Sequence, residues 1–228
     1  MTVLYDNIGI NQGMLLDLPF REGRGIITQD VAKPHHPVTL VNTPTWTALP
    51  SGLMTLNLNG TNEYLQCLNA SCADLEFTTE DYTILVVINW ATGDDSQIIM
   101  GRYAVDTGGW ELYLYDDWHY YLTLRHHHAG GTALRSGCYS GGWAKNTNWL
   151  LGISRIGTTA FHYRNGVALP TIGSLEDPEA TTSDLVIGVR FTKDRDNFKN
   201  MLWRPRVRLG ALTAEQHMIA YEQIKRWL

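Results

Sequence analysis

The run Tyr82–Trp90 (YTILVVINW) is the most apolar segment of the sequence. It is rich in β-branched residues and shorter than a typical helix, which favours a strand. Successive side chains of a strand point to opposite faces of a sheet. A strand that is apolar at every position is therefore buried on both faces. The run predicts a central strand with other structure packed on each side.

Short apolar segments separated by turn signals recur along the rest of the chain, as expected of a sandwich or barrel. Asn59-Gly60, Gly157-Thr158 and Asn165-Gly166 are pairs that favour tight turns. One all-β sandwich commonly fills ~200–250 residues, so we predict a single domain over residues 1–228. The expected strands are residues 14–20, 25–30, 38–41, 53–58, 64–68, 82–90, 97–102, 110–115, 119–125, 148–156, 159–164, 185–191 and 201–209.

Only the C-terminal end has a helical pattern. Thr213 is a good N-cap, and Gln216 three residues later completes a capping box. Ala220, Ile224 and Trp227 then recur at helical spacing and form one apolar stripe. We expect a helix over about residues 213–227 that docks on the flank of the sandwich.

Composition excludes several classes of function. The net charge is −5, whereas a nucleic-acid-binding surface needs a broad excess of basic residues. The local cluster Arg204, Arg206 and Arg208 alternates along an expected strand, which indicates a solvated sheet face. No segment approaches the ~20 apolar residues of a membrane span.

The sequence begins MTVLYDNIGI, without the basic start and long apolar run of a signal peptide. We therefore expect synthesis in the cytoplasm, with a virion surface as one destination that needs no secretion signal. Cys67, Cys72 and Cys138 are an odd number for a disulfide framework. Three thiols are the simpler interpretation, and a bond between Cys67 and Cys72 stays open.

The order of segments resembles the laminin G-like jelly rolls of the concanavalin A-like lectin and glucanase superfamily. The resemblance covers roughly residues 14–226 and implies an antiparallel jelly-roll β-sandwich with one C-terminal helix. The family's acidic pair on the penultimate strand is replaced here by Arg204, Pro205 and Arg206. The matching motifs are LLDLPFREGRG at 15–25, LNLNGTNEYL at 56–65, the run 82–90, W…SRIGT…YRNG at 149–166, LVIG at 185–188 and ALTAEQ at 211–216.

Some hydrolases of this superfamily carry three spaced carboxylates on one strand. This sequence has no such pattern. Its acidic pairs Asp94-Asp95, Asp116-Asp117 and Glu176-Asp177 are adjacent and lie in expected turns. Adjacent side chains of a strand point apart, so none of these pairs forms a glycosidase dyad. We predict no catalytic residues, and a polysaccharide-active hydrolase or lyase remains an alternative.

Aromatic side chains give the strongest indication of a binding site, because their faces stack on sugars. Trp110, Tyr113 and Tyr115 lie on one expected hairpin, and Trp118 lies in its turn. Trp143 follows Ser140-Gly141-Gly142 in a glycine-rich loop. An exposed tryptophan in a turn or loop indicates contact with a glycan or with a protein partner.

The sequence alone leaves two metal sites as hypotheses. His126 and His128 share one face of a strand at a spacing that suits a transition metal, although no third ligand lies nearby. Asp194 and Asp196 carry oxygen ligands at alternate positions of an expected loop, which is compatible with Ca²⁺. No other cofactor is expected.

Three functions are compatible with these features. The first is a structural protein of a virus particle, on the capsid or tail, with glycan binding as an added activity. The second is a cellular lectin-like carbohydrate-binding module, and the third is the polysaccharide-active enzyme. The expected partners are glycans or other virion or cell-surface proteins, and a homo-oligomer is left open. Loss of glycan binding in Trp118→Ala would support the carbohydrate-binding module, and a stable trimer or a copurifying capsid would support the virion protein.

Overall fold

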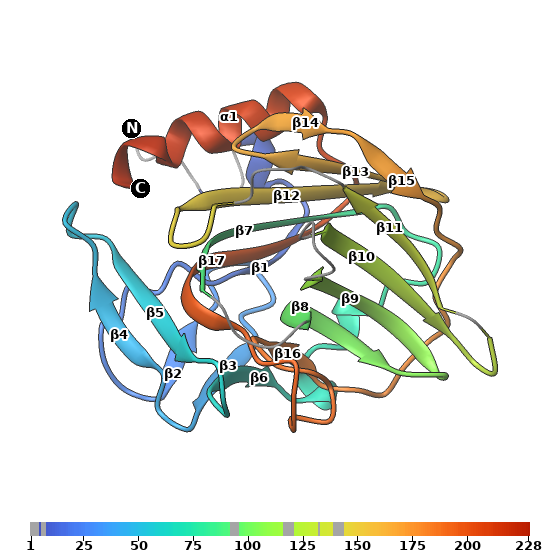
Figure 1. Ribbon diagram of the computed structural model, residues 1–228, viewed down its shortest axis with the longest axis horizontal. Helices are drawn as coiled ribbons and strands as arrows, with labels where there is room; N and C mark the ends of the chain where they lie inside the picture. Colours follow the sequence, from blue (N-terminus) through green and yellow to red (C-terminus); the bar gives the residue numbers. More distant parts are fainter. Residues whose placement is uncertain (1–4, 6–7, 92–95, 116–120, 132, 139–143) are drawn as a thin grey trace.

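The computed structural model describes residues 5, 8–91, 96–115, 121–131, 133–138 and 144–228. In this described part of the chain, strands form two antiparallel sheets and one α-helix follows them near the C-terminus (Figure 1). Buried residues of both sheets join one apolar core. The predicted all-β sandwich with a C-terminal helix is therefore confirmed.

The first sheet has eight strands among the described residues, with β7 near its centre between β12 and β17. All residues of β7 except Asn89 are buried, so the prediction of a strand covered on both faces is confirmed. The order is β14 (Val167–Leu169), β13 (Thr159–Arg164), β12 (Trp149–Ile156), β7 (Tyr82–Trp90), β17 (Lys199–Leu209), β5 (Met54–Asn59) and β4 (Thr45–Ala48), and β1 (Met14–Asp17) also pairs with β17.

The second sheet has nine strands within the described ranges. Its order is β15 (Thr171–Gly173), β11 (Leu134–Cys138), β10 (Tyr121–His128), β9 (Gly108–Tyr115), β8 (Ser96–Ala104), β16 (Leu185–Ile187), β6 (Tyr64–Cys67), β3 (Pro37–Val41) and β2 (Ile27–Gln29). Strands β8, β9 and β10 are its longest and lie side by side (Figure 1).

The prediction that Arg204, Arg206 and Arg208 form a solvated face is wrong. The pairing of β17 with β7 shifts between Trp203 and Arg206, where Arg204 has a φ of 49°. This bulge breaks the two-residue alternation that the prediction assumed. Arg206 is buried, and burial lowers its pKa to about 10.

The bulge also creates a charged anchor for β1. Arg204 donates to both carboxylate oxygens of Asp17, at 2.9 and 2.8 Å. Asp17 is fully buried, and the hydrogen bonds and charge of Arg204 lower its pKa although burial by itself would raise it. Arg204 therefore holds β1 against β17 through a buried ion pair.

The C-terminal helix α1 (Ala214–Ile224) begins as predicted, because Thr213 and Gln216 form the capping box. His217, Ala220 and Ile224 are its buried residues. A short 3₁₀ turn follows over Lys225–Trp227, where Trp227 is 39% exposed, so the predicted apolar stripe ends at Ile224.

Several details of the strand set differ from the sequence prediction. Strands β4, β11, β14 and β15 lie in segments where no strand was expected, and β16 ends at Ile187 instead of residue 191. Cys67, Cys72 and Cys138 are free, buried thiols. None of the helices in the described ranges combines the length and apolarity needed to span a bilayer.

Candidate functional site

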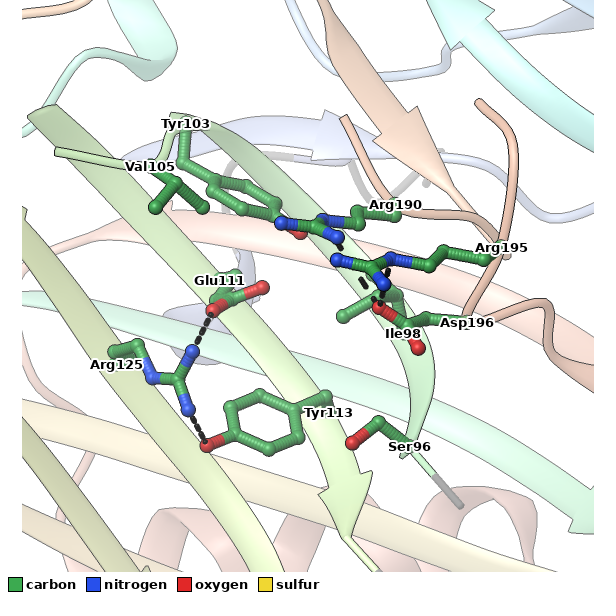
Figure 2. A pocket seen from close by; sticks show the side chains of 10 residues that line it. All are labelled: Ser96, Ile98, Tyr103, Val105, Glu111, Tyr113, Arg125, Arg190, Arg195 and Asp196. Atoms are coloured by element: carbon green, nitrogen blue, oxygen red, sulfur yellow. Dashed lines mark hydrogen bonds and ion pairs between the residues drawn. The ribbon is translucent and has the colours of Figure 1, made fainter. Parts of the chain in front are cut away.

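A pocket of about 260 Å³ lies on the face of the nine-stranded sheet that is turned away from the core. Strands β8, β9 and β10 form its floor, and the loop 188–198 forms one rim (Figure 2). Its lining residues are Ser96, Ile98, Tyr103, Val105, Glu111, Tyr113, Arg125, Arg190, Arg195 and Asp196.

Strand alternation places these side chains. Trp110, Leu112 and Leu114 of β9 belong to the core cluster, so Glu111 and Tyr113 between them point the other way. On β10, Arg125 lies directly opposite Glu111 in the strand pairing and therefore shares its face.

An ion pair fixes the centre of the floor. Arg125 donates to Glu111 Oε1 at 3.0 Å and to the Tyr113 hydroxyl at 2.7 Å (Figure 2). Glu111 and Tyr113 are buried, whereas the Arg125 side chain is 28% exposed. Burial raises the pKa of Tyr113, so its hydroxyl stays protonated at neutral pH. The floor thus presents one edge of a positioned guanidinium to the pocket.

His127 and Tyr103 extend this network beneath the rim. His127 Nε2 lies 3.0 Å from Glu111 Oε1, and its ring stacks on Tyr103 at a centroid distance of 4.8 Å. Burial, reinforced by the Glu111 carboxylate, raises the pKa of Tyr103 well above its usual value. Glu111 therefore accepts hydrogen bonds from Arg125 and His127 and links β9 to β10 in the pocket floor.

The rim carries two further arginines. Arg190 and Arg195 each lie 4.0 Å from Asp196 Oδ2, and their guanidinium groups face the pocket side by side (Figure 2). The rim loop is attached to β8 through the Ile98 amide, which donates to the Asp196 carbonyl at 3.0 Å, and through the Gly188 amide, which donates to the Ile99 carbonyl at 3.0 Å.

Of the predicted aromatic site, Trp110 and Tyr113 are almost inaccessible. Trp110 is fully buried in the core and donates to the Leu75 carbonyl at 2.9 Å, so it offers no stacking surface. Tyr113 lines the pocket but is 2% exposed, and Tyr115 is partly exposed. Trp118 and Trp143 lie outside the described residues.

The histidine pair is not arranged for a metal. His126 is buried, with Nε2 at 2.8 Å from the Tyr82 hydroxyl and Nδ1 at 2.6 Å from the Glu176 carbonyl. Both of its ring nitrogens are therefore engaged. Burial lowers the pKa of His126 to about 4. His128 is partly buried, and the described residues contain no group of three metal-ligating side chains.

The two aspartates proposed for Ca²⁺ have different surroundings. Asp194 is exposed and accepts a hydrogen bond from Thr192, while Asp196 faces the two rim guanidinium groups. Two positive charges next to Asp196 oppose a cation at that position. The Ca²⁺ site stays a prediction that this charge arrangement disfavours.

Sequence reasoning missed Glu111, Arg125, Arg190 and Arg195. The expected turn at 116–118 pairs Glu111 with Thr123, whereas the structure pairs it with Arg125, so the pair of opposite charges was hidden by the register. No local pattern connects the rim loop to that hairpin, because the contact joins segments far apart in sequence.

Comparison with known proteins identifies the fold. No family model and no curated protein matches the sequence. Among solved structures, the binding domain of Paraclostridial Mosquitocidal Protein 1 is similar over 94% of this chain and 53% of its own length, at 14% identity and a TM-score of 0.70. A botulinum neurotoxin type C structure, described as dependent on two ganglioside molecules for cell entry, matches over 95% and 52% at 11% identity and a TM-score of 0.68.

The binding domain of botulinum neurotoxin DC in complex with rat synaptotagmin II matches over 94% of this chain and 52% of its own, at 12% identity and a TM-score of 0.67. At such identities the likeness shows the sandwich fold alone. The chain spans about half the length of these structures.

Proposed function

We propose that this chain is a non-catalytic binding module that takes a glycan in the pocket of the nine-stranded sheet. The observation that carries the proposal is the network of Glu111, Arg125 and Tyr113, joined by hydrogen bonds of 2.7–3.0 Å. Binding sites depend on a few fixed polar groups for specificity, and groups already held in place lose little freedom on binding.

The structural likeness supports a binding role. Two of the similar structures are described as binding domains, one of them in complex with synaptotagmin II, and the third is described with ganglioside molecules. A ganglioside carries a glycan headgroup. Because this chain corresponds to only half of those structures, the glycan is proposed for this chain on its own pocket.

The pocket also supports binding over hydrolysis. A glycosidase needs one carboxylic acid and one carboxylate that act on the sugar from defined positions. Glu111 accepts from Arg125 and His127, and Asp196 lies beside Arg190 and Arg195. Both pocket carboxylates are thus partnered by cationic or donor groups, which favours a structural role for each.

A glycan array tests the proposal with a matched pair of variants. Arg125→Ala removes the guanidinium at the pocket floor, and Arg226→Gln removes one positive charge from the exposed C-terminal turn. We expect the wild type and Arg226→Gln to bind the same glycans and Arg125→Ala to lose them. Absence of any glycan signal from the folded wild type would contradict the proposal.

The setting of such a module stays a prediction from the sequence. A component of a virus particle and a cellular lectin-like domain would both use the same pocket. Isolation of the native protein with assembled particles would distinguish the two.

A further inference from the structure

We propose that the pocket takes a saccharide that carries a carboxylate group, and that Arg190 and Arg195 bind this carboxylate. The inference rests on the proposed function and names the chemical class of its ligand. Three observations carry it. The guanidinium groups of the two rim arginines lie too far from Asp196 for a hydrogen bond, the Asp196 carboxylate already lies beside them, and the pocket is small.

The rim arginines differ in their partners from the arginine of the pocket floor and from the arginine that anchors β1. Arg125 and Arg204 each donate two hydrogen bonds of 2.7–3.0 Å to fixed acceptors. Arg190 and Arg195, within the described residues, have Asp196 Oδ2 as their ionic partner at 4.0 Å, which is too long for a hydrogen bond. Their guanidinium donors are therefore available to an acceptor in the pocket.

The accessibility of the rim fits a ligand site. The Arg195 side chain is 64% exposed and the Arg190 side chain 18% exposed, so incoming groups reach both from solvent. A guanidinium presents donors in a planar fork that matches a carboxylate with two bonds. Two such forks side by side can hold both oxygens of one carboxylate.

Asp196 shows that a carboxylate is accommodated between these groups. It lies within 4.0 Å of both guanidinium groups without closing on either. Among the described residues that line the pocket there are three guanidinium groups, those of Arg125, Arg190 and Arg195, and two carboxylates. The surplus positive charge favours an anionic ligand over a cation or a neutral one.

The volume limits the ligand to a small group. The pocket of about 260 Å³ falls slightly below the ~300–1,000 Å³ range of sites for drug-sized molecules. It therefore suits one terminal saccharide unit better than a long chain. Ser96 and the exposed edge of Arg125 remain as partners for its hydroxyl groups.

Calorimetric titration of the whole chain with paired probes tests the charge requirement. The pairs are sialyllactose against lactose, and trigalacturonate against its carboxyl-reduced form. We expect the acidic member of at least one pair to bind ~10-fold or more tightly than its neutral counterpart, as one charged hydrogen bond of ~1.4 kcal/mol would give. Equal binding of both members would overturn the inference and leave the proposed function standing. No binding of any saccharide would overturn both.

Two further probes separate other sources of the same charge. Sulfated lactose presents a sulfate, and a hexaglutamate peptide presents carboxylates on a polypeptide. We expect both to bind more weakly than the acidic saccharide. Tighter binding of the sulfate or of the peptide would overturn the assignment of a saccharide carboxylate.

Arg195→Gln tests the rim directly, with Lys193→Gln as its matched control. Lys193 lies in the same loop, but it pairs with Asp184 at 3.0 Å and does not line the pocket. We expect Arg195→Gln to weaken binding of the acidic saccharide ~10-fold and Lys193→Gln to leave it unchanged. Equal losses in both variants would indicate only the general charge of the loop and would overturn the site.

Asp196→Asn gives a test in the opposite direction. Asp196 has a φ of 56°, a conformation that asparagine tolerates, so the loop can keep its shape. Removal of the competing carboxylate should tighten binding of the acidic saccharide several-fold. Weaker binding would overturn the inference, and Ca²⁺ binding that is lost in this variant would show a cation site instead.

Discussion

The two sheets have outward faces that use similar residues in different ways. On the eight-stranded sheet, His217 of α1 stacks on Tyr163 at 3.8 Å, and its Nε2 lies 2.8 Å from Ser154 Oγ. On the nine-stranded sheet, His127 stacks on Tyr103 at 4.8 Å and lies 3.0 Å from Glu111. The first histidine belongs to the helix α1, which packs on its sheet (Figure 1). The second contacts Glu111 and Tyr103, which line the pocket (Figure 2).

The comparison shows that residue type alone does not mark a site. His217 is buried against neutral partners, and burial together with the charge of Arg206 lowers its pKa to about 3. Its network seats the helix, because Ser154 Oγ and Thr83 Oγ1 both accept from the Leu212 amide. On the pocket face, arginines with exposed edges surround the network. We therefore expect the covered face to control stability and the open face to control binding.

Acid should produce the largest effect on the covered face. The pKa of His217 falls from 6.5 to about 3 on folding, so the unfolded chain takes up the proton first as the pH falls. Stability from this group is complete above pH 6.5 and is lost towards pH 3. Well below pH 6.5 one proton changes the free energy of unfolding by ~1.4 kcal/mol per pH unit, which gives a loss of about 2 kcal/mol between pH 6.5 and 4.5. The free energy of unfolding, measured by urea titration at a series of pH values, should depend less steeply on pH in His217→Gln, by the contribution of one proton. The same pH dependence in the wild type and the variant would contradict this.

Gly152→Ala should dislodge the helix at neutral pH. A Cβ at Gly152 would lie 2.4 Å from His217 Nδ1 and 2.7 Å from its Cε1, so the ring or the helix must shift. Overpacking of this kind costs ~1–3 kcal/mol. Gly9→Ala is the control, because nothing lies within 4 Å of its Cβ position. Denaturant midpoints should fall in the first variant alone, while both variants keep saccharide binding when folded.

Tyr113→Phe should lower stability less than Gly152→Ala does, and it should also weaken binding of the acidic saccharide. It removes the hydroxyl that accepts from Arg125 at 2.7 Å, and a hydrogen bond of this kind contributes ~1 kcal/mol. Arg125 would lose one of its two positioning contacts, so acidic-saccharide affinity should fall in the same calorimetric titration. Unchanged affinity would show that the floor network serves the fold alone.

Arg195→Gln should have the smallest effect on stability. The side chain is 64% exposed, and substitutions at such positions usually change stability by less than ~0.5 kcal/mol. The melting temperature should therefore stay close to that of the wild type while binding of the acidic saccharide weakens ~10-fold. A large drop in melting temperature would mean that the rim supports the fold, against the division between the two faces.

The fold was predictable where local patterns are strong. The central strand Tyr82–Trp90 and the Thr213–Gln216 capping box appear at the predicted residues because apolar content and cap chemistry act locally. Strand β4 (Thr45–Ala48) was missed, since it lies at the sheet edge with partly exposed side chains and carries no buried pattern.

The candidate site was predictable only in part. Tyr113 was named and does line the pocket, but as a buried partner of Arg125 and not as a stacking surface. Trp110 is one strand position away from the pocket face, and that single step places it in the core. Arg190 and Arg195 were missed because their loop reaches the hairpin only in the folded chain.

The sequence by itself determined an all-β domain closed by one capped helix, because β-branched runs, turn pairs and caps act over a few residues. Tertiary structure alone decided which face of each sheet became covered. α1 packs on the eight-stranded sheet, whereas the loop 188–198 leaves a pocket on the other. Burial and charge pairing depend on neighbours brought together across the chain. The same physical chemistry therefore gives a neutral histidine, His217, that attaches α1 to one sheet and a positively charged pocket around Arg125 on the other.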